Sequence, residues 1–345
     1  MQTSPTIICL TPVRNEAWIL DRFIQCASMW ADHIIVADQQ SDDGSREIAR
    51  KYSKVTLIDN LSTSYDEFER QKALVYEARK IPGPRLMIAL DADEFLTAEV
   101  LEHVEWKTVL ESQPGTIIQL QWINLLPNMR LCWIPEEDKV FGFMDDDISE
   151  HIGKIIHSPR VPTPEGASVL SLKKIKVLHY QYTDWQRMQS KHRWYQIWEA
   201  VNFPNKSSIS IYRQYHHMYS SIAHELLPVK PNWFRNYTNN HIDMTSVSQP
   251  KPYWWDEEAI QLLEEYCPHY FRKLDIWELS WSNKVFDGDL IEDPRSRTEK
   301  LVHLWLRKTQ SMFYPPSIEN NSRVVYLVTK LTVLAVDKAL ALLGW

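Results

Sequence analysis

Short apolar runs alternate with helix-length segments through the first 125 residues, and this alternation limits the possible folds more than any other feature of the chain. Strands are expected at 6–10, 33–37, 55–58, 85–90 and 115–120, and helices at 16–30, 44–52, 65–80 and from Thr97 onward. Strands and helices that alternate in this way form βαβ units, whose parallel sheet is buried on both faces. The sequence therefore predicts an α/β fold of the Rossmann-like type, with a mostly parallel sheet flanked by helices.

The rest of the chain has a different character. Residues 125–182 carry short strand-like runs, whereas the chain from Asp184 onward reads as mostly helical and rich in aromatic residues. We expect an α/β domain over 1–182, a helical region over 183–321 and an amphipathic terminal helix over 322–345. The chain has 15 tryptophans and only 8 glycines, which favours a large aromatic core over a loop-rich all-β fold.

The terminal segment 322–345 predicts a helix that buries most of its circumference. Arg323, Lys330 and Asp337 fall at equal, seven-residue intervals and form one polar stripe on an otherwise apolar helix. No stretch of the chain has the length of a clean transmembrane helix. Packing within the protein or against another copy is our first interpretation, and a helix that lies in a membrane interface is the alternative.

Charge and cysteine content narrow the class of protein. The formal net charge is −7 and the pI is near 6.0, whereas nucleic-acid binding usually needs a basic face. The 4 cysteines have no CxxC spacing, as expected in a reducing compartment. The first residues lack the basic region of a signal peptide. We expect a cytoplasmic protein, at the inner face of the membrane if the terminal helix binds lipid.

Polar and acidic residues follow three of the expected strands. Residues 14–16 (Arg-Asn-Glu) follow the first, 38–44 (Asp-Gln-Gln-Ser-Asp-Asp-Gly) follow the second, and Asp91-Ala92-Asp93 follows the fourth. In open α/β sheets, ligands bind outside the carboxyl ends of the strands. The sequence therefore predicts a polar ligand site that draws on three strand ends.

The Asp91-Ala92-Asp93 pair is suited to a hard cation. Mg²⁺ binds through one or two carboxylates together with substrate phosphates, and Mn²⁺ also prefers oxygen ligands. The alternative is a helix N-cap, where Asp is also favoured. A calcium loop that starts at Asp38 does not fit, because its sixth and twelfth positions would be Asp43 and Ala49 instead of Gly and Glu.

Together, three segments resemble the nucleotide-sugar glycosyltransferases of the GT-A fold, family 2 type. Residues 11–16 (Thr-Pro-Val-Arg-Asn-Glu) resemble that family's first-strand motif, and residues 36–45 resemble its Val-Val-Asp-Asp-Gly-Ser motif. Residues 91–96 resemble the Asp-Ala-Asp-Glu-Phe form typical of one branch. Gln39 and Gln40 replace the Asp-Gly of the commonest form. The three motifs agree in order and spacing over about the first 100 residues.

The resemblance implies a set of site residues. Asp93 would bind Mg²⁺ or Mn²⁺, Asp91 would contact metal or ribose, and Asp38 would contact the nucleobase or ribose. Arg70 would face the diphosphate. The remaining nucleotide-sugar contacts implied by the three motifs and by a segment around residue 154 are Thr11, Pro12, Arg14, Asn15, Glu16, Ala92 and Lys154.

Two further features could complete the site. His179 ends an apolar strand, where GT-A enzymes often place a third metal ligand or a phosphate contact; a core histidine is the alternative. Arg187 and Lys191 stand beside aromatic residues on one face of the helix expected from Asp184. They could bind phosphate, or they could belong to an aromatic core stripe.

In the resembling family, an acidic residue downstream of the metal motif acts as the catalytic base. We expect the base within 146–150, with Glu150 ahead of Asp147 and Asp146. The reaction would be inverting, from a nucleotide-diphosphate sugar to a carbohydrate or lipid-linked acceptor, with no nucleic-acid partner.

Other functions remain open at the level of sequence. A sugar-phosphate nucleotidyltransferase also combines an α/β sheet with acidic metal sites, but it usually has a glycine-rich loop after its first strand, which this chain lacks. A non-catalytic protein of the same fold could bind sugar or nucleotide. A two-metal phosphatase or nuclease would need more acidic residues at metal-bridging positions.

Overall fold

The computed structural model describes residues 4–216, 226–277, 292–313 and 323–345. The chain forms two compact units. Unit 1 consists of Met1–Asp184 and Pro228–Gln249, and unit 2 of Trp185–Leu227 and Pro250–Trp345. The segment 228–249, which we expected within the helical region, thus returns to the α/β unit.

The centre of unit 1 is a parallel sheet, as the alternation predicts. Its four strands are β1 (Thr6–Val13), β2 (His33–Asp38), β3 (Val55–Asp59) and β4 (Arg85–Ala89), in the order β4-β1-β2-β3. All three neighbouring pairs are parallel. β1, β2 and β4 are buried along almost their whole length, which explains their continuous apolar sequence.

Beyond β4 the sheet becomes mixed. β8 (Lys139–Met144) lies antiparallel between β4 and β6 (Ile117–Leu125), and β9 (Val169–His179) runs parallel to β6. Two short strands, β5 (Glu94–Leu96) and β7 (Leu131–Trp133), pair antiparallel with β9 and β6. A two-residue strand, β10 (Leu227–Pro228), stands at the chain boundary between the units. The α/β fold is therefore confirmed, with a parallel centre and a mixed flank.

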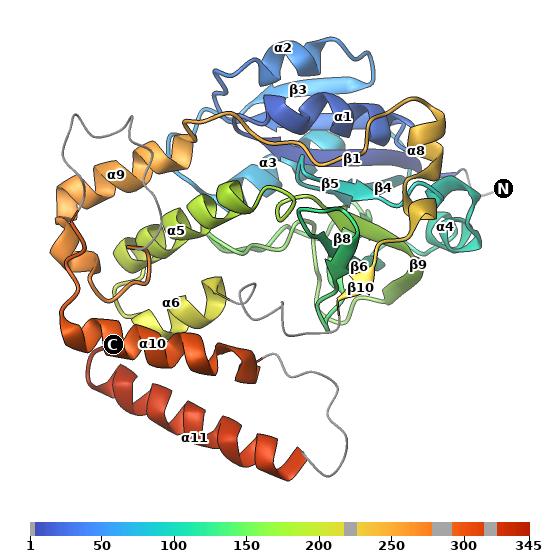
Figure 1. Cartoon of the computed structure of the whole chain (residues 1–345). Coiled ribbons are helices and arrows are strands. Elements are labelled where there is room, and N and C mark those ends of the chain that lie inside the picture. Colours follow the sequence, from blue (N-terminus) through green and yellow to red (C-terminus); the bar gives the residue numbers. More distant parts are fainter. Residues whose placement is uncertain (1–3, 217–225, 278–291, 314–322) are drawn as a thin grey trace. The chain divides into compact units, whose positions relative to one another are not determined.

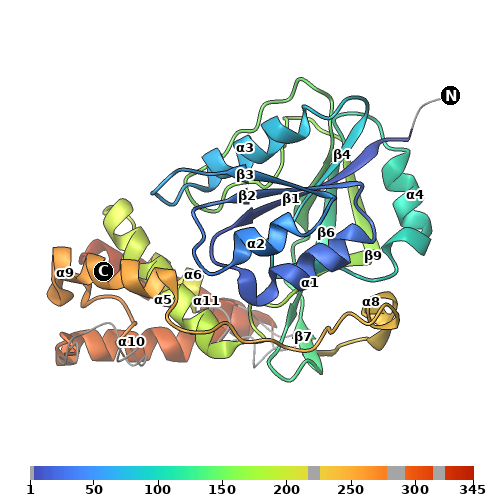
Figure 2. The ribbon, with the colours of Figure 1, turned by 90° about the horizontal axis from the view of Figure 1, so that it is seen from above.

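Helices cover both faces of the sheet. Figure 2 shows α3 (Glu67–Ala78) on one face and α1 (Ala17–Ser28) and α2 (Ser45–Arg50) on the other. The core beneath α3 includes Leu74, Val75 and Ala78, whereas the core on the other face is larger and also takes in α4 (Val104–Leu110) and α8 (Arg235–Asn239).

The helix expected from Thr97 begins later than predicted. Residues 94–96, directly before it, form β5, and the Thr97 N–H extends this pairing by donating to the Lys176 carbonyl at 2.9 Å. A 3-10 turn, η1 (Val100–Glu102), follows, and α4 starts only at Val104. Pairing with β9 outweighs the local helical pattern here, which is a common tertiary override.

Unit 2 is helical. Within the described ranges its α-helices are α5 (Trp185–Asn202), α6 (Ser208–Tyr215), α9 (Trp254–Tyr266), α10 (Arg297–Thr309) and α11 (Arg323–Leu342) (Figure 1). Aromatic side chains form much of its interior: the Trp194 and Trp254 rings meet edge to face at 5.1 Å, and Trp255 is almost fully buried. None of the helices in the described ranges combines the length and the apolar character needed to cross a membrane.

Candidate functional site

Strand register in unit 1 brings the three polar strand ends to one edge. Val13 at the end of β1 is opposite Asp38 at the end of β2, which is opposite Asp59 at the end of β3. β4 runs parallel to β1, and the Leu90 N–H donates to the Leu10 carbonyl at 3.0 Å. Asp91 therefore leaves the sheet on the same side as Asp38.

Hydrogen bonds hold the loops after β1 and β2 together. Asn15 has a positive φ of 55°, and its N–H donates to Ser41 Oγ at 2.8 Å. Its side chain exchanges two hydrogen bonds with Asp42, at 2.8 and 3.0 Å. The Glu16 N–H donates to Ser45 Oγ, while the Glu16 carboxylate accepts from Trp18 Nε1. Asn15 and Glu16 thus shape the edge of the site.

The side chain of Asp38 is buried, and hydrogen bonds hold one of its two carboxylate oxygens. Arg46 donates to its Oδ2 at 2.6 Å and the Ser41 N–H donates to the same oxygen at 3.2 Å. Its Oδ1 is buried and has no hydrogen-bond partner within the described ranges, and the same holds for Thr11 Oγ1 on the neighbouring strand. Buried polar atoms in a native protein are normally hydrogen-bonded, so these two oxygens are suited to a ligand.

The two glutamines that depart from the family motif have a structural function. Gln39 Nε2 donates to the carbonyls of Ser62 and Ser64 at 3.0 and 2.9 Å, and Gln40 Nε2 donates to the Leu61 carbonyl at 3.1 Å. These bonds fasten the segment after β3 to the end of β2, next to Asp38.

Arg160 contacts the acidic motif. Its Nη2 donates to Asp91 Oδ2 and to Glu94 Oε1, both at 2.9 Å, and its Nη1 donates to Glu94 Oε2. Glu94 is fully buried and also accepts the Asp91 N–H at 2.9 Å. Burial raises the pKa of Glu94, and the Arg160 charge acts against this rise. Ala92, between the two aspartates, packs into the core.

Asp93 faces His179. β5 pairs with β9 so that Glu94 is opposite His179, and His179 Nε2 lies 3.9 Å from Asp93 Oδ1. His179 Nδ1 is 2.8 Å from Asn124 Oδ1, and the ring stacks on Trp122 at 4.3 Å. With Asn124 Oδ1 as its acceptor, Nδ1 carries a proton, and Nε2 is the ring nitrogen on the Asp93 side.

This donor set fits a divalent cation. A carboxylate and a neutral imidazole suit Mn²⁺, and the hydrogen bond from Nδ1 is typical of a metal-ligating histidine. No three His, Cys, Asp or Glu side chains in the described ranges gather closely enough to enclose an ion. Mg²⁺ and Mn²⁺ sites of this type take one or two carboxylates and obtain further oxygens from substrate phosphates and water.

The sequence also predicts ligand contacts from four basic residues. Arg70 lies 5.3 Å from the Tyr65 ring and 3.9 Å from the Glu67 carboxylate. Lys154 is exposed on the segment before Arg160. Arg187 and Lys191 belong to unit 2, where their charged groups lie 5.2 and 5.8 Å from the Trp255 ring.

Two of the predicted base residues, Asp146 and Asp147, follow a strand end at the other edge of the sheet. Met144, at the end of β8, pairs with Leu86 near the start of β4. Asp146 and Asp147 follow directly, and the preceding Asp145 N–H donates to the Arg85 carbonyl at 2.9 Å. Leu86 and Asp91 are about five residues apart along β4 and the residues that follow it, which corresponds to roughly 15 Å. The structure does not bring Asp146 or Asp147 to the acidic motif.

The side chains on this far edge have structural partners. Asp145 accepts from Arg79 and Arg85, each at 2.9 Å, and Arg85 also contacts Asp147. Asp146 accepts from the Ser149 N–H at 2.8 Å and from its hydroxyl at 2.6 Å. The exposed Glu150 comes next along the chain, directly after Ser149, whose carbonyl accepts from Arg79.

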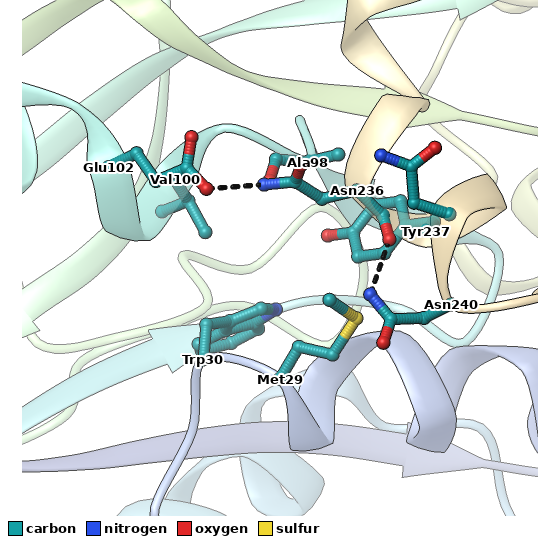
Figure 3. A pocket seen from close by; sticks show the side chains of 9 residues that line it. Met29, Trp30, Ala98, Val100, Glu102, Asn236, Tyr237 and Asn240 are labelled. Atoms are coloured by element: carbon teal, nitrogen blue, oxygen red, sulfur yellow. Dashed lines mark hydrogen bonds between the residues drawn. The ribbon is translucent and has the colours of Figure 1, made fainter.

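A separate pocket of about 270 Å³ opens where α1 ends and β2 is about to begin, away from the Asp91 edge (Figure 3). Met29, Trp30 and Val100 supply apolar surface. Asn236 donates to Glu102 at 3.2 Å on its polar side. Its position at the amino end of the strands separates it from the site described above.

Comparison with known proteins identifies no family for the chain. No protein family model matches it, and no curated protein sequence does. GalNAc-T7, solved with UDP, GalNAc and Mn²⁺, is 12% identical, with a TM-score of 0.35 over 77% of this chain and 59% of its own.

Two further neighbours are matched over about a third of this chain. Glucosyl-3-phosphoglycerate synthase from Mycobacterium tuberculosis is 16% identical, with a TM-score of 0.26 over 34% of this chain and 44% of its own. A 4-diphosphocytidyl-2C-methyl-D-erythritol synthase is 12% identical, with a TM-score of 0.27 over 35% of this chain and 61% of its own. Each alignment spans less than two thirds of the neighbour's length. At these values the similarities add nothing to what the residues of this chain indicate.

Proposed function

We propose that the chain is a metal-dependent glycosyltransferase of the family 2 type. It would transfer a sugar from a nucleotide-diphosphate sugar to a hydroxyl group of a carbohydrate or lipid-linked acceptor. The observation that carries the proposal is the pair of Asp93 and His179, 3.9 Å apart, on the sheet edge that also holds the half-satisfied Asp38. The motif resemblance of residues 11–16, 36–45 and 91–96 supports the same chemistry.

The nucleoside part would bind against β1 and β2. Asp38 Oδ1 and Thr11 Oγ1 are buried oxygens that can accept hydrogen bonds from a nucleobase N–H or a ribose hydroxyl. Arg46 and the Ser41 N–H fix the Asp38 carboxylate from its other side. A ligand would therefore meet a preorganised acceptor instead of one that must first be ordered.

The diphosphate would lie near Asp91 and Asp93. When bound, Mg²⁺ or Mn²⁺ would stabilise the negative charge that develops on the leaving diphosphate. Asp93 and His179 would hold the ion, and Asp91 would contact the ion or the ribose. Arg160 orients Asp91 through a charge-assisted hydrogen bond of 2.9 Å and balances the charge of Glu94. Direct in-line attack by the acceptor hydroxyl would invert the anomeric configuration.

Thermal unfolding with nucleotides tests the proposal. UDP, GDP and dTDP are each added with Mn²⁺ or with EDTA, and a ligand that binds only the folded state raises Tm. At 100 times Kd the expected stabilisation is about 2.7 kcal/mol. We expect one nucleotide to act strongly and only with the metal. If none raises Tm in the presence of Mn²⁺ or Mg²⁺, the proposal is wrong.

Product analysis separates the rival activities. A glycosyltransferase releases a nucleoside diphosphate from a nucleotide sugar, whereas a nucleotidyltransferase releases pyrophosphate from a nucleoside triphosphate and a sugar phosphate. A binding protein would show the shift in Tm without either product. The Asp93→Asn variant is the control for metal-dependent release.

A further inference from the structure

One side of α11 packs into unit 2. Val333 and Asp337 are only 2% and 6% exposed. Arg213 of α6 donates to both carboxylate oxygens of Asp337, at 3.0 and 3.1 Å, and Trp305 of α10 donates to it at 3.2 Å. The polar stripe expected on this helix is therefore partly an internal contact, and it determines which side of the helix faces inward.

The other side of α11 is apolar and open. Leu331 is 65% exposed and Leu342 is 80% exposed. With 3.6 residues per turn, these positions lie on the side of the helix opposite Val333. Together with their neighbours they form the outer face of α11, which consists of Leu327, Val328, Leu331, Leu334, Lys338 and Leu342.

The exposed charge on the outer face is positive. Lys338 is its one charged residue, and Asp337, the only acidic residue of α11, is buried. On the neighbouring α10, Arg297 and Lys308 are exposed, Lys300 pairs with Asp293 at 3.2 Å, and the acidic residue Glu299 is buried in the capping box. A leucine-rich face with only basic exposed charges is unusual in a chain whose formal net charge is −7.

We propose that the outer face of α11 docks on an anionic lipid surface, with the helix parallel to the bilayer. An amphipathic helix with leucines on one face and lysines among or beside them binds the boundary between head groups and acyl chains. Lys338 can keep its ammonium at the phosphates while its methylene chain lies among the leucines. Each basic residue near such a surface adds attraction to anionic lipids.

A second copy of the chain is the less suitable occupant. A twofold contact through the outer face would place Lys338 of each copy in an apolar interface near its counterpart. Bringing two like charges together out of water costs free energy, and no exposed carboxylate on α11 is available to offset them. A lipid surface supplies the missing negative charge. The inference depends on unit 2 alone and is independent of the proposed sugar transfer.

Vesicle flotation of the full chain tests this surface. We expect binding to vesicles of phosphatidylcholine with roughly 30% phosphatidylglycerol, weak binding to phosphatidylcholine alone, and loss of binding as salt screens the charges. The triple variant Leu327→Gln/Leu331→Gln/Leu342→Gln should reduce partitioning roughly tenfold or more, and Lys338→Glu should reduce it on anionic vesicles only. Both changes replace exposed side chains, so Tm should not change.

Matched controls lie on α4 of unit 1. Val104 is 71% exposed and the Lys107 side chain 74%, so Val104→Gln and Lys107→Glu make the same chemical changes on another helix. Neither control should alter flotation. Sedimentation velocity of the same variants reports self-association. A dimer that the triple variant abolishes, or a monomer that binds no vesicles, would overturn the proposal, as would equal loss of binding in the controls.

Discussion

His179 Nε2 lies 3.9 Å from Asp93 Oδ1, and the same imidazole ring is held at its other nitrogen by Asn124 Oδ1 at 2.8 Å. A residue of the turn before β5 thus faces the last residue of β9, and Asn124 of β6 holds the ring from its other side. Trp122 stacks on the ring at 4.3 Å and limits its rotation. The arrangement resembles the indirect support that proteins give to metal-ligating histidines.

The Asn124→Ala variant should weaken metal binding without removing a ligand. Without the hydrogen bond at Nδ1, neither the orientation of the His179 ring nor the position of its proton is fixed. Such supporting contacts typically contribute 10–100-fold in metal affinity. Isothermal titration calorimetry with Mn²⁺, at a saturating concentration of nucleotide, measures the Mn²⁺ affinity. His179→Ala should lower it further. Unchanged Mn²⁺ affinity in both variants would rule out His179 as a ligand.

Asp38→Asn should reduce nucleotide affinity roughly 10–100-fold, because a hydrogen bond to a charged group contributes about 1.5–3 kcal/mol. Asp59→Asn is the matched control, since Arg46 also donates to Asp59 at 2.6 Å but the Asp59 side chain is 60% exposed. Isothermal titration with the nucleotide that raises Tm compares the two. Equal losses in both variants would indicate that only the Arg46 contact matters.

Arg160→Met should destabilise unit 1 by about 3–5 kcal/mol at pH 8, because it leaves the buried Glu94 carboxylate without its cation. Burial raises the pKa of Glu94, and removal of Arg160 raises it further. A raised folded-state pKa contributes stability below the unfolded value of about 4.3 and loses it as pH rises. The deficit should therefore shrink towards pH 5.

Chemical denaturation at both pH values measures that deficit. The double variant Arg160→Met/Glu94→Gln removes the charge as well as its partner and should recover part of the stability at pH 8. A deficit that is the same at pH 5 and pH 8 would show that Arg160 acts through packing alone.

The strand ends were predictable because their signals are local. Each apolar run lies next to its own polar residues, so Asp38 and Asp91 could be assigned to one edge once the sheet was recognised as parallel. Arg160 could not be found in this way. It reaches Asp91 from 69 positions away, along an irregular segment with no period to read.

The edge assigned to Asp146 and Asp147 depends on strand direction, which an apolar run does not encode. Residues 139–144 read as a strand in either direction, and only pairing with β4 and β6 makes β8 antiparallel. A parallel β8 would have ended near Asp91. Similarly, the helical pattern after Thr97 gave no sign that residues 94–96 would pair with β9.

Asp275→Asn should destabilise unit 2 by about 3–5 kcal/mol at neutral pH. Asp275 accepts from Arg295 and Arg307, each at 2.8 Å. Burial disfavours its charge, but the Arg307 hydrogen bond and the nearby histidines outweigh this effect and lower its pKa. A lowered pKa contributes stability above the unfolded value of about 3.9 and loses it as pH falls. The deficit measured by urea unfolding should thus be smaller at pH 3 than at pH 7.

Substitutions along 145–150 distinguish a structural edge from a catalytic one. Asp145→Asn should cost about 3–5 kcal/mol of stability, because it removes the buried carboxylate charge that Arg79 and the buried Arg85 share. Asp147→Asn and Glu150→Gln change exposed side chains, the first of them roughly 15 Å from Asp91 along β4, and we expect both variants to keep kcat within about twofold. Tm and turnover are measured on the same preparations, with Asp93→Asn as the inactive reference. A loss of turnover of about 100-fold or more in either exposed variant, at unchanged Tm, would instead assign the base to this loop, since general bases contribute about 10²–10⁴-fold.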